Sequence, residues 1–293
     1  MKYIKGFDGI RAVSILMVVC LHAGLTDLLP ATSFVQNRLF LLVSGNAGVD
    51  MFFCLSGFLI TRILLQEKDK SHTIHFRKFY ARRFLRLLPP LIIFYIIILL
   101  LIALGYTDST YTGLLVSFFY LYNYIPNVYY SSILGHTWSL GVEEQFYLIW
   151  PIIISIFNRY KIVLVCFIII LMCYIVPLLT DNITFVHNHK SHLLSASFKV
   201  NRFFLPAAYP IIAGCLLSVL IFYFKVKTKR IFENNISFLV TFMLFLSPLY
   251  YPFVLLNIAY LVHIFGIALL LSWIFYHPAS LLTKMLEFKP LSY

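Results

Sequence analysis

The chain has 293 residues, of which 61% are hydrophobic and 12% are charged, and its formal net charge at pH 7 is +12. A soluble domain carries about twice that charged fraction, because water must wet its surface. Long apolar stretches recur along the chain, close to the roughly 20 residues that span a bilayer. This composition argues against a soluble helical bundle. The positive charges gather in short loops, as topology signals do, so we expect no nucleic-acid partner.

Hydropathy predicts an all-α fold, a polytopic transmembrane helical bundle of about eight spanning helices in a single domain over residues 1–293. The expected spans are Ile10–Leu29, Val49–Leu65, Leu87–Leu104, Trp138–Phe157, Ile162–Leu179, Phe203–Phe224, Ile236–Tyr250 and Phe253–Tyr276. One further apolar stretch, Thr112–Ile125, is short and rich in Tyr and Phe.

Lysine and arginine set the expected orientation in the membrane, because basic loops stay on the cytoplasmic side. The N-terminus, the loop at 66–86 and the cluster at 225–230 are all basic. An even number of crossings must separate the two basic loops, and the four clear spans between them satisfy this. Thr112–Ile125 is therefore predicted to be re-entrant or interfacial. We expect a multi-pass protein of the cell inner membrane with a cytoplasmic N-terminus and the lipid bilayer as partner.

The first predicted span carries Arg11 and His22, eleven residues apart. That spacing is about three helical turns, so both side chains project from one face, which Asp8 shares. Arg11 is expected at the cytoplasmic rim and His22 near mid-membrane. A histidine at that depth is often a hydrogen-bonded packing residue, but ionisable groups are costly there, and we favour a functional role for His22.

Three arginines, Arg82, Arg83 and Arg86, stand within five residues before the third span. If this segment is helical, Arg83 and Arg86 share a face. A positive-inside anchor would explain the charge. Guanidinium groups also match phosphate oxygens bidentately, which indicates a site at the cytoplasmic rim for a polyphosphate nucleotide.

The segment from Trp138 to Tyr147 opens the fourth span with two adjacent carboxylates, Glu143 and Glu144. Carboxylates entering a membrane helix need partners, although both are expected near the external end, where exposure at the interface is the alternative. Ser139, Glu143 and Tyr147 form one face at i, i+4 spacing. One carboxylate that orients or recharges a histidine base would be ordinary acid–base design.

Other candidate residues have mostly structural interpretations. Asp50 is a carboxylate just inside the expected external boundary of the second span, whereas Ser56 and Gly57 suit close helix packing. His263 is expected to be a packing residue, and no metal site is predicted. The histidines of one polar loop are expected to be solvated: His187, His189 and His192. The cysteines are expected to act as small core residues: Cys20, Cys54, Cys166, Cys173 and Cys215.

Four segments, in order and spacing, resemble the acyltransferase-3 family of membrane O-acyltransferases: FDGIRAVSILMVVCLH, GVDMFFCLSGFLITRIL, FYARRFLRLLPP and HTWSLGVEEQFYLIWP. Together they cover most of residues 5–155. Further along, Asn201–Phe203 and Gly214 are similar to a later family helix that carries an arginine and a glycine.

The resemblance implies an enzyme that transfers acetyl or another short acyl group, not an amino-acyl group. The donor would be cytoplasmic acyl-CoA, first of all acetyl-CoA. The acceptor would be a carbohydrate hydroxyl, often of lipopolysaccharide, exopolysaccharide or peptidoglycan. It implies catalytic roles for His22, Glu143 and Glu144, and acyl-CoA binding by Arg11, Arg83 and Arg86. Substrate contact or structural support is expected from Asp8, Asp50, Trp138, Ser139, Tyr147 and Arg202.

Family members continue past a segment like Lys289–Leu291 into about two further helices, so the resemblance implies a chain truncated at its C-terminus. The chain is then a fragment, a truncated reading frame or an inactive relic. The rival function is a proton-coupled transporter or flippase of a glycan or lipid, in which His22 and the glutamates form a proton path. The sequence gives no oligomeric state.

Overall fold

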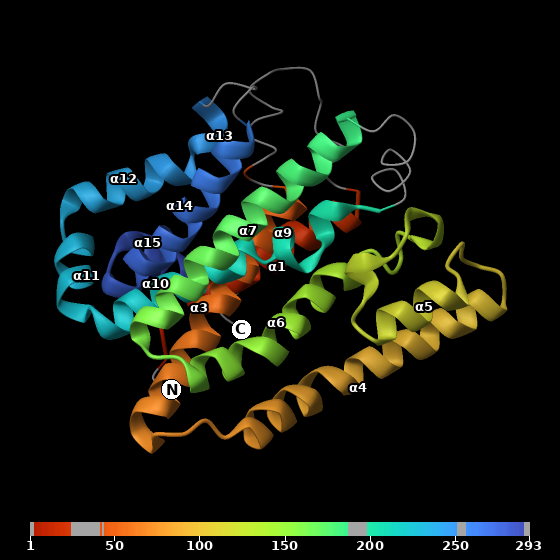
Figure 1. Ribbon diagram of the computed structural model, residues 1–293, viewed down its shortest axis with the longest axis horizontal. Coiled ribbons are helices and arrows are strands. Elements are labelled where there is room, and N and C mark those ends of the chain that lie inside the picture. Colours follow the sequence, from red (N-terminus) through yellow and green to blue (C-terminus); the bar gives the residue numbers. More distant parts are fainter. Residues whose placement is uncertain (1–2, 25–41, 43, 187–197, 251–255, 290–293) are drawn as a thin grey trace. The chain divides into compact units, whose positions relative to one another are not determined.

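The computed structural model describes residues 3–24, 42, 44–186, 198–250 and 256–289 (Figure 1). Regular structure in these ranges is helical, apart from one isolated β-bridge between Pro126 and Phe198. The all-α prediction is therefore confirmed. The chain divides into two compact units, the first made of Met1–Gln66, Asn158–Cys166 and Tyr209–Tyr293 and the second of Glu67–Phe157 and Phe167–Ala208.

The first unit is built mainly from helices of the two chain ends. Its helices are α1 (Phe7–His22), most of α3 (Gly45–Ser71), the first turns of α7 (Arg159–Val186), α10 (Tyr209–Tyr223), α11 (Lys225–Phe232), α12 (Asn235–Phe245), α13 (Ser247–Tyr250), α14 (Leu256–Tyr276) and α15 (Leu281–Leu286). Helix α12 lies along α14 (Figure 1).

Two glycines let the backbones of α3 and α10 approach closely. A side chain at Gly57 would overlap the carbonyl oxygen of Ile211, and one at Gly214 would overlap that of Cys54. Small residues at such crossings let membrane helices pack backbone to backbone. The predicted packing role of Gly57 is confirmed, and Gly214 is its counterpart on α10.

Helix α1 is shorter than the predicted span Ile10–Leu29, because it ends at His22. Gly24 has a positive φ of 67°, and its amide donates to the carbonyl of Leu21. A glycine in the left-handed region is a common helix terminator. The predicted helical continuation directly after His22 is therefore wrong, and residues 25–29 lie outside the described ranges.

The second unit contains the 28-residue apolar helix α4. Its helices are α4 (Phe76–Ala103), α5 (Tyr111–Phe118), η2 (Tyr122–Tyr124), η3 (Asn127–Tyr129), α6 (Thr137–Ile156), the remainder of α7, η4 (Val200–Arg202) and α9 (Phe204–Ala207). Helix α4 begins eleven residues before the predicted start at Leu87, so the basic segment is helical. Arginine and lysine are good helix formers, which explains why the helix extends through them.

The segment predicted to be re-entrant or interfacial, Thr112–Ile125, is too short to cross a membrane. It consists of the eight-residue helix α5, a residue with positive φ (Tyr120, 58°) and the single turn η2. Helix α5 lies beside α4 (Figure 1), and Tyr95 shares a hydrogen bond of 2.9 Å with Ser117. The segment therefore folds back instead of continuing as a span.

Three helices in the described ranges are long and apolar enough to cross a membrane: Gly45–Ser71, Phe76–Ala103 and Arg159–Pro177. Helices α10 and α11 meet at 111° and would add a fourth if they count as one span. The predicted number of about eight spans is not confirmed. On α4, the side chains of Ile93, Ile96, Ile97 and Leu100 are 50–61% exposed. Such a continuous apolar face suits lipid, and the chain is a membrane protein.

Candidate active site

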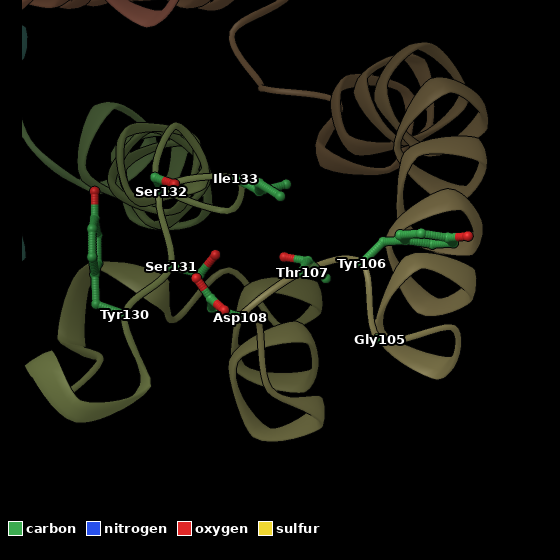
Figure 2. A pocket seen from close by; sticks show the side chains of 8 residues that line it. All are labelled: Gly105, Tyr106, Thr107, Asp108, Tyr130, Ser131, Ser132 and Ile133. Carbon is green, nitrogen blue, oxygen red and sulfur yellow. The ribbon is translucent and has the colours of Figure 1, made fainter.

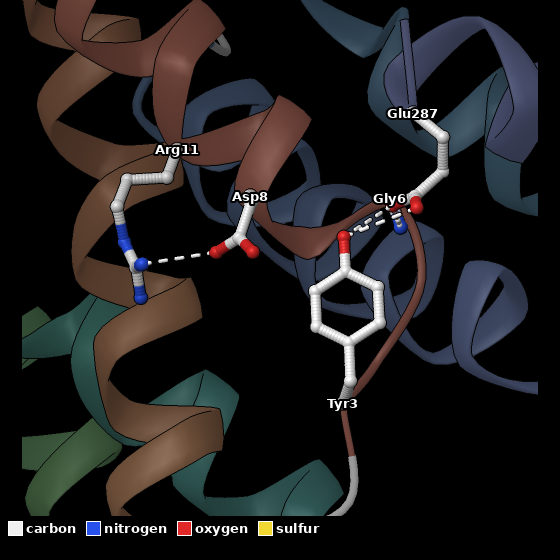
Figure 3. Close-up of polar contacts among 5 residues, drawn as sticks. All are labelled: Tyr3, Gly6, Asp8, Arg11 and Glu287. Atoms are coloured by element: carbon white, nitrogen blue, oxygen red, sulfur yellow. Dashed lines mark hydrogen bonds and ion pairs between the residues drawn. The ribbon is translucent and has the colours of Figure 1, made fainter. Parts of the chain in front are cut away.

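The amino-terminal end of α1 is fixed by the end of α15 (Figure 3). The Glu287 carboxylate, one residue beyond α15, accepts hydrogen bonds from the backbone N–H of Gly6 and from the Tyr3 hydroxyl, the latter at 2.9 and 3.1 Å. A side chain at Gly9 would overlap the Leu286 carbonyl oxygen, so the two backbones are in close contact. Sequence reasoning missed Glu287, because nothing local connects it with residues more than 280 positions earlier.

Helix α1 carries Arg11 near its beginning and His22 as its last residue. Arg11 forms an ion pair of 3.1 Å with Asp8, and the two side chains are 36% and 39% exposed (Figure 3). His22 is also exposed. Since the helix is continuous, Arg11 and His22 share a face about 16 Å apart along the axis. The structure therefore places a guanidinium and an imidazole at opposite ends of one helix face.

Asp50 is buried in α3 and accepts a hydrogen bond of 3.0 Å from the Tyr260 hydroxyl of α14. A buried carboxylate needs such a donor. His263, also on α14, lies 2.5 Å from the Phe245 carbonyl oxygen through Nδ1, which agrees with the predicted packing role. The tyrosine partner of Asp50 had no sequence signal beyond its position in an apolar span.

In the second unit, four candidate residues form one cluster between α4 and α6. The Arg83 guanidinium lies 3.9 Å from the Glu144 carboxylate and 3.1 Å from the centre of the Tyr147 ring. The Tyr147 hydroxyl donates a hydrogen bond to Glu143. We call Arg83, Glu143, Glu144 and Tyr147 the arginine–glutamate cluster. The i, i+4 pairing of Glu143 with Tyr147 was predicted, whereas the pairing with Arg83 was not.

This cluster corrects the predicted depths of its members. Arg83 was placed at the cytoplasmic rim and Glu144 near the external end, yet their contact puts them at one level. The Tyr80 hydroxyl donates to the carbonyl of Leu148, and Phe94, which is later on α4, packs against His136, which is earlier in the chain than Leu148. Helix α4 therefore runs antiparallel to α6. The error arose because α4 begins at Phe76, which puts Arg83 two turns inside the helix.

The arginines near the beginning of α4 therefore differ in environment. The Arg83 side chain is 23% exposed and faces α6, and its Nε has no hydrogen-bond partner among the described residues. Arg82 and Arg86 are exposed. The expected pair of Arg83 and Arg86 is thus divided. Arg83 is engaged by a carboxylate, and Arg86 is available to a ligand.

Arg202 and Trp138 are brought together by a residue that the sequence did not single out, Tyr130. The Arg202 guanidinium donates a hydrogen bond of 3.2 Å to the Tyr130 hydroxyl and lies over the rings of Tyr130 and Trp138, at 4.5 and 5.6 Å. Ser139 donates to the His136 carbonyl at 3.0 Å, which is a local backbone contact. Arg202 therefore connects η4 to Tyr130 and to the beginning of α6.

Gln145, next to the two glutamates, anchors the folded-back segment. Its amide nitrogen donates to the Tyr120 carbonyl at 2.8 Å and to the Asn123 side chain at 2.9 Å. These bonds satisfy a backbone carbonyl at the point where α5 ends. Sequence reasoning passed over Gln145 because a single amide beside two carboxylates carries no pattern of its own.

No group of three His, Cys, Asp or Glu side chains in the described ranges has a geometry that would hold a metal ion. The histidines of the predicted polar loop, His187, His189 and His192, lie outside those ranges. Cys54, Cys166, Cys173 and Cys215 are buried and form no disulfide, as expected of small core residues. Cys20 is only partly buried, so the core prediction is wrong for this residue.

Long apolar helices, two of which are joined by the ion pair of Arg83 and Glu144, define a helical membrane protein with charge at a helix contact. The profile of the acyltransferase domain family matches residues 4–282, and the chain belongs to this family.

Three curated relatives that match the chain are named as O-acetyltransferases or putative O-acetyltransferases. The chain is 28% identical over 316 aligned residues to the peptidoglycan O-acetyltransferase OatA of Listeria monocytogenes, a match that covers 99% of this chain and 47% of the relative. A putative O-acetyltransferase of Staphylococcus aureus is 32% identical over 185 residues, covering 55% of this chain and 27% of the relative. A putative peptidoglycan O-acetyltransferase of Bacillus subtilis is 32% identical over 167 residues, covering 53% and 24%. The chain thus spans about half the length of the Listeria relative. No solved structure matches it significantly.

Proposed function

We propose that the chain transfers an acetyl group from acetyl-CoA, bound from the cytoplasm, to a hydroxyl of a cell-envelope glycan. Peptidoglycan is the first acceptor to test, because two of the relatives are named for it. The protein would act in the cell inner membrane with its N-terminus in the cytoplasm, as the positions of the basic segments indicate.

The observation that carries this proposal is the pairing of Arg11 and His22 on one face of α1. Arg11 supplies a fixed positive charge, and His22 supplies the side chain best suited to proton transfer near neutral pH. About 16 Å of helix separates them. An extended pantetheine arm is long enough to reach from a phosphate near Arg11 to a thioester near His22.

The reaction balances with a single base. As the acceptor hydroxyl attacks the thioester carbonyl, the His22 imidazole takes the hydroxyl proton. The new ester C–O bond forms, the C–S bond breaks, and the leaving thiolate takes a proton, so that CoA departs as the free thiol. Alternatively, His22 accepts the acyl group first and passes it to the hydroxyl in a second step.

In this proposal, the exposed guanidinium groups bind the phosphates of CoA. Arg86 is exposed on α4, and Arg11 is partly exposed beside Asp8. Each presents donors that match phosphate oxygens. Arg83 also remains a proposed phosphate ligand, but its contact with Glu144 supports a second role, in which it fixes α4 against α6. Glu144 shares this positioning role through its ion pair with Arg83, and Glu143 accepts a hydrogen bond from Tyr147 on its own helix.

The test uses the full chain in lipid nanodiscs with acetyl-CoA labelled in the acetyl group and a soluble peptidoglycan oligosaccharide. We expect label in the oligosaccharide as a base-labile ester, together with an equal amount of free CoA thiol. Nanodiscs without the protein control for spontaneous transfer. Oligosaccharide that stays unlabelled while acetyl-CoA remains intact would refute the proposal and favour the transporter or relic alternatives.

A further inference from the structure

A polar cavity of about 320 Å³ lies in the second unit, where the chain leaves α4 and where it approaches α6 (Figure 2). It is lined by Gly105, Tyr106, Thr107, Asp108, Tyr130, Ser131, Ser132 and Ile133. Most of these side chains carry a hydroxyl group, and one carries a carboxylate. The cavity has no residue in common with the proposed donor and catalytic groups.

Hydrogen bonds between the two lining segments fix one wall of the cavity. Ser109 and Ser131 share a hydrogen bond of 2.6 Å, and Thr107 donates to Ser109 at 3.2 Å. The buried Tyr122 hydroxyl accepts from the Ser131 amide at 2.8 Å and donates to the Ser131 carbonyl at 3.2 Å. The bond between Ser109 and Ser131 joins the two segments, and Tyr122 holds Ser131 in place. This wall is therefore formed without a ligand.

A second wall is the side chain of Tyr130, which is held by cations. Lys199 lies 4.5 Å from the ring centre, and Arg202 lies at the same distance and bonds to the hydroxyl. Gly135 leaves room for this hydroxyl, since a Cβ there would lie 2.7 Å from it. Tyr130 therefore has a fixed orientation.

Asp108 is the charged group of the cavity. Its side chain is exposed and is drawn beside Ser131 in Figure 2. Within the described ranges it makes no hydrogen bond and no ion pair. An unengaged carboxylate accepts hydrogen bonds from two or more donors and repels phosphate. The lining is thus suited to a neutral molecule rich in hydroxyl groups and unsuited to the phosphates of CoA.

We propose that this cavity binds a neutral sugar unit of the acceptor glycan, with Asp108 accepting hydrogen bonds from the sugar hydroxyls and Thr107 and Ser132 completing the contacts. The inference rests on the proposed function, which supplies the glycan. The cavity lies at the end of α4 opposite its arginines, and the basic segments indicate that this is the external end. A cell-envelope glycan would approach from that side.

The test measures binding of a fluorescently labelled peptidoglycan oligosaccharide to the full chain in nanodiscs, without acetyl-CoA. Asp108→Asn keeps the shape and removes the charge, and we expect about tenfold weaker binding, the loss typical of a charged hydrogen bond. Asp69→Asn is the matched control, because Asp69 is also exposed but stands before α4 begins. The affinity of this control should equal that of the wild type.

Equal affinity of Asp108→Asn and wild type, or absence of binding to the wild type at millimolar oligosaccharide, would overturn the inference. If Asp108→Asn fails to fold, Ser132→Ala replaces it, with a severalfold loss expected and an unchanged affinity again contradicting the cavity. The proposed function and the proposed sugar site can each be refuted without the other. Glycan binding that depends on Asp108 in a protein that transfers no acetyl group would refute only the proposed function. Acetyl transfer with an unchanged KM for glycan in Asp108→Asn would refute only the cavity.

Discussion

Arg83 lies 3.9 Å from Glu144, the second of two adjacent carboxylates on α6, and stacks on the ring of Tyr147. Both charged side chains are largely shielded, with 23% and 20% of their surface exposed. A shielded charge without a partner is costly, so each of these two side chains depends on the other. This pair connects α4 to α6 in the part of the chain that holds most of the site residues predicted from the sequence.

Arg83→Met should destabilise the protein by about 3 kcal/mol, because it leaves the Glu144 carboxylate without its cation. Thermal unfolding in detergent, followed by tryptophan fluorescence, measures the loss. Arg82→Met is the control, since Arg82 is the exposed neighbour on the same helix. The double variant Arg83→Met with Glu144→Gln should recover much of the stability. If Arg83→Met unfolds at the same temperature as Arg82→Met, the pair contributes nothing.

Arg86→Ala should raise the KM for acetyl-CoA about tenfold and leave kcat unchanged, because loss of one charged hydrogen bond to phosphate weakens binding by that amount. Arg77→Ala is the matched control. Arg77 is also exposed on α4 but nine residues away, which places it on the opposite side of the helix. Steady-state kinetics with varied acetyl-CoA distinguish the two variants, and equal KM values for both would remove Arg86 from the phosphate site.

Gly57→Ala and Gly214→Ala should each prevent stable folding of the first unit, because the added Cβ would overlap a carbonyl of the other helix. Gly105→Ala serves as the comparison, since nothing lies within 4 Å of its Cβ and only its positive φ of 72° disfavours alanine. That penalty is about 1 kcal/mol. Yield of monodisperse protein after size-exclusion chromatography reports the difference. Normal yield of Gly57→Ala would contradict the close α3–α10 contact.

Glu287→Ala should loosen the beginning of α1, because the Gly6 amide and the Tyr3 hydroxyl lose their acceptor. Hydrogen exchange of residues 3–10 should become faster, while exchange in α4 and α6 stays unchanged. Glu233→Ala is the control, because Glu233 forms an exposed i, i+4 pair with Lys229. Surface pairs of this kind contribute little. Unchanged exchange at residues 3–10 in Glu287→Ala would show that other contacts hold α1.

The long apolar stretches of α4, α6 and α7 were enough to predict these helices, because membrane helices follow hydropathy closely. The ends of the helices were harder to predict. The basic segment before Leu87 was interpreted as a loop, although arginine and lysine extend a helix readily, and Gly24 ended α1 before the apolar stretch was complete. Hydropathy averages over such local effects.

The types of the site residues were predictable, whereas their partners were not. Glu143 with Tyr147 follows from helical spacing, but Arg83 with Glu144 and Arg202 with Tyr130 join distant parts of the chain. One sequence contains no signal for such pairs. Asp50 shows the same limit, since its partner Tyr260 stands 210 residues away.

The role proposed for His22 is that of the general base in acetyl transfer. It is tested most directly by acetyl transfer to a peptidoglycan oligosaccharide in nanodiscs that carry His22→Ala or the control His75→Ala, an exposed histidine at the beginning of α4. General-base catalysis contributes about 10²–10⁴-fold to rate, so His22→Ala should lose activity by that factor at unchanged acetyl-CoA affinity. His75→Ala should retain full activity. Ester formation by His22→Ala at the wild-type rate would contradict the account.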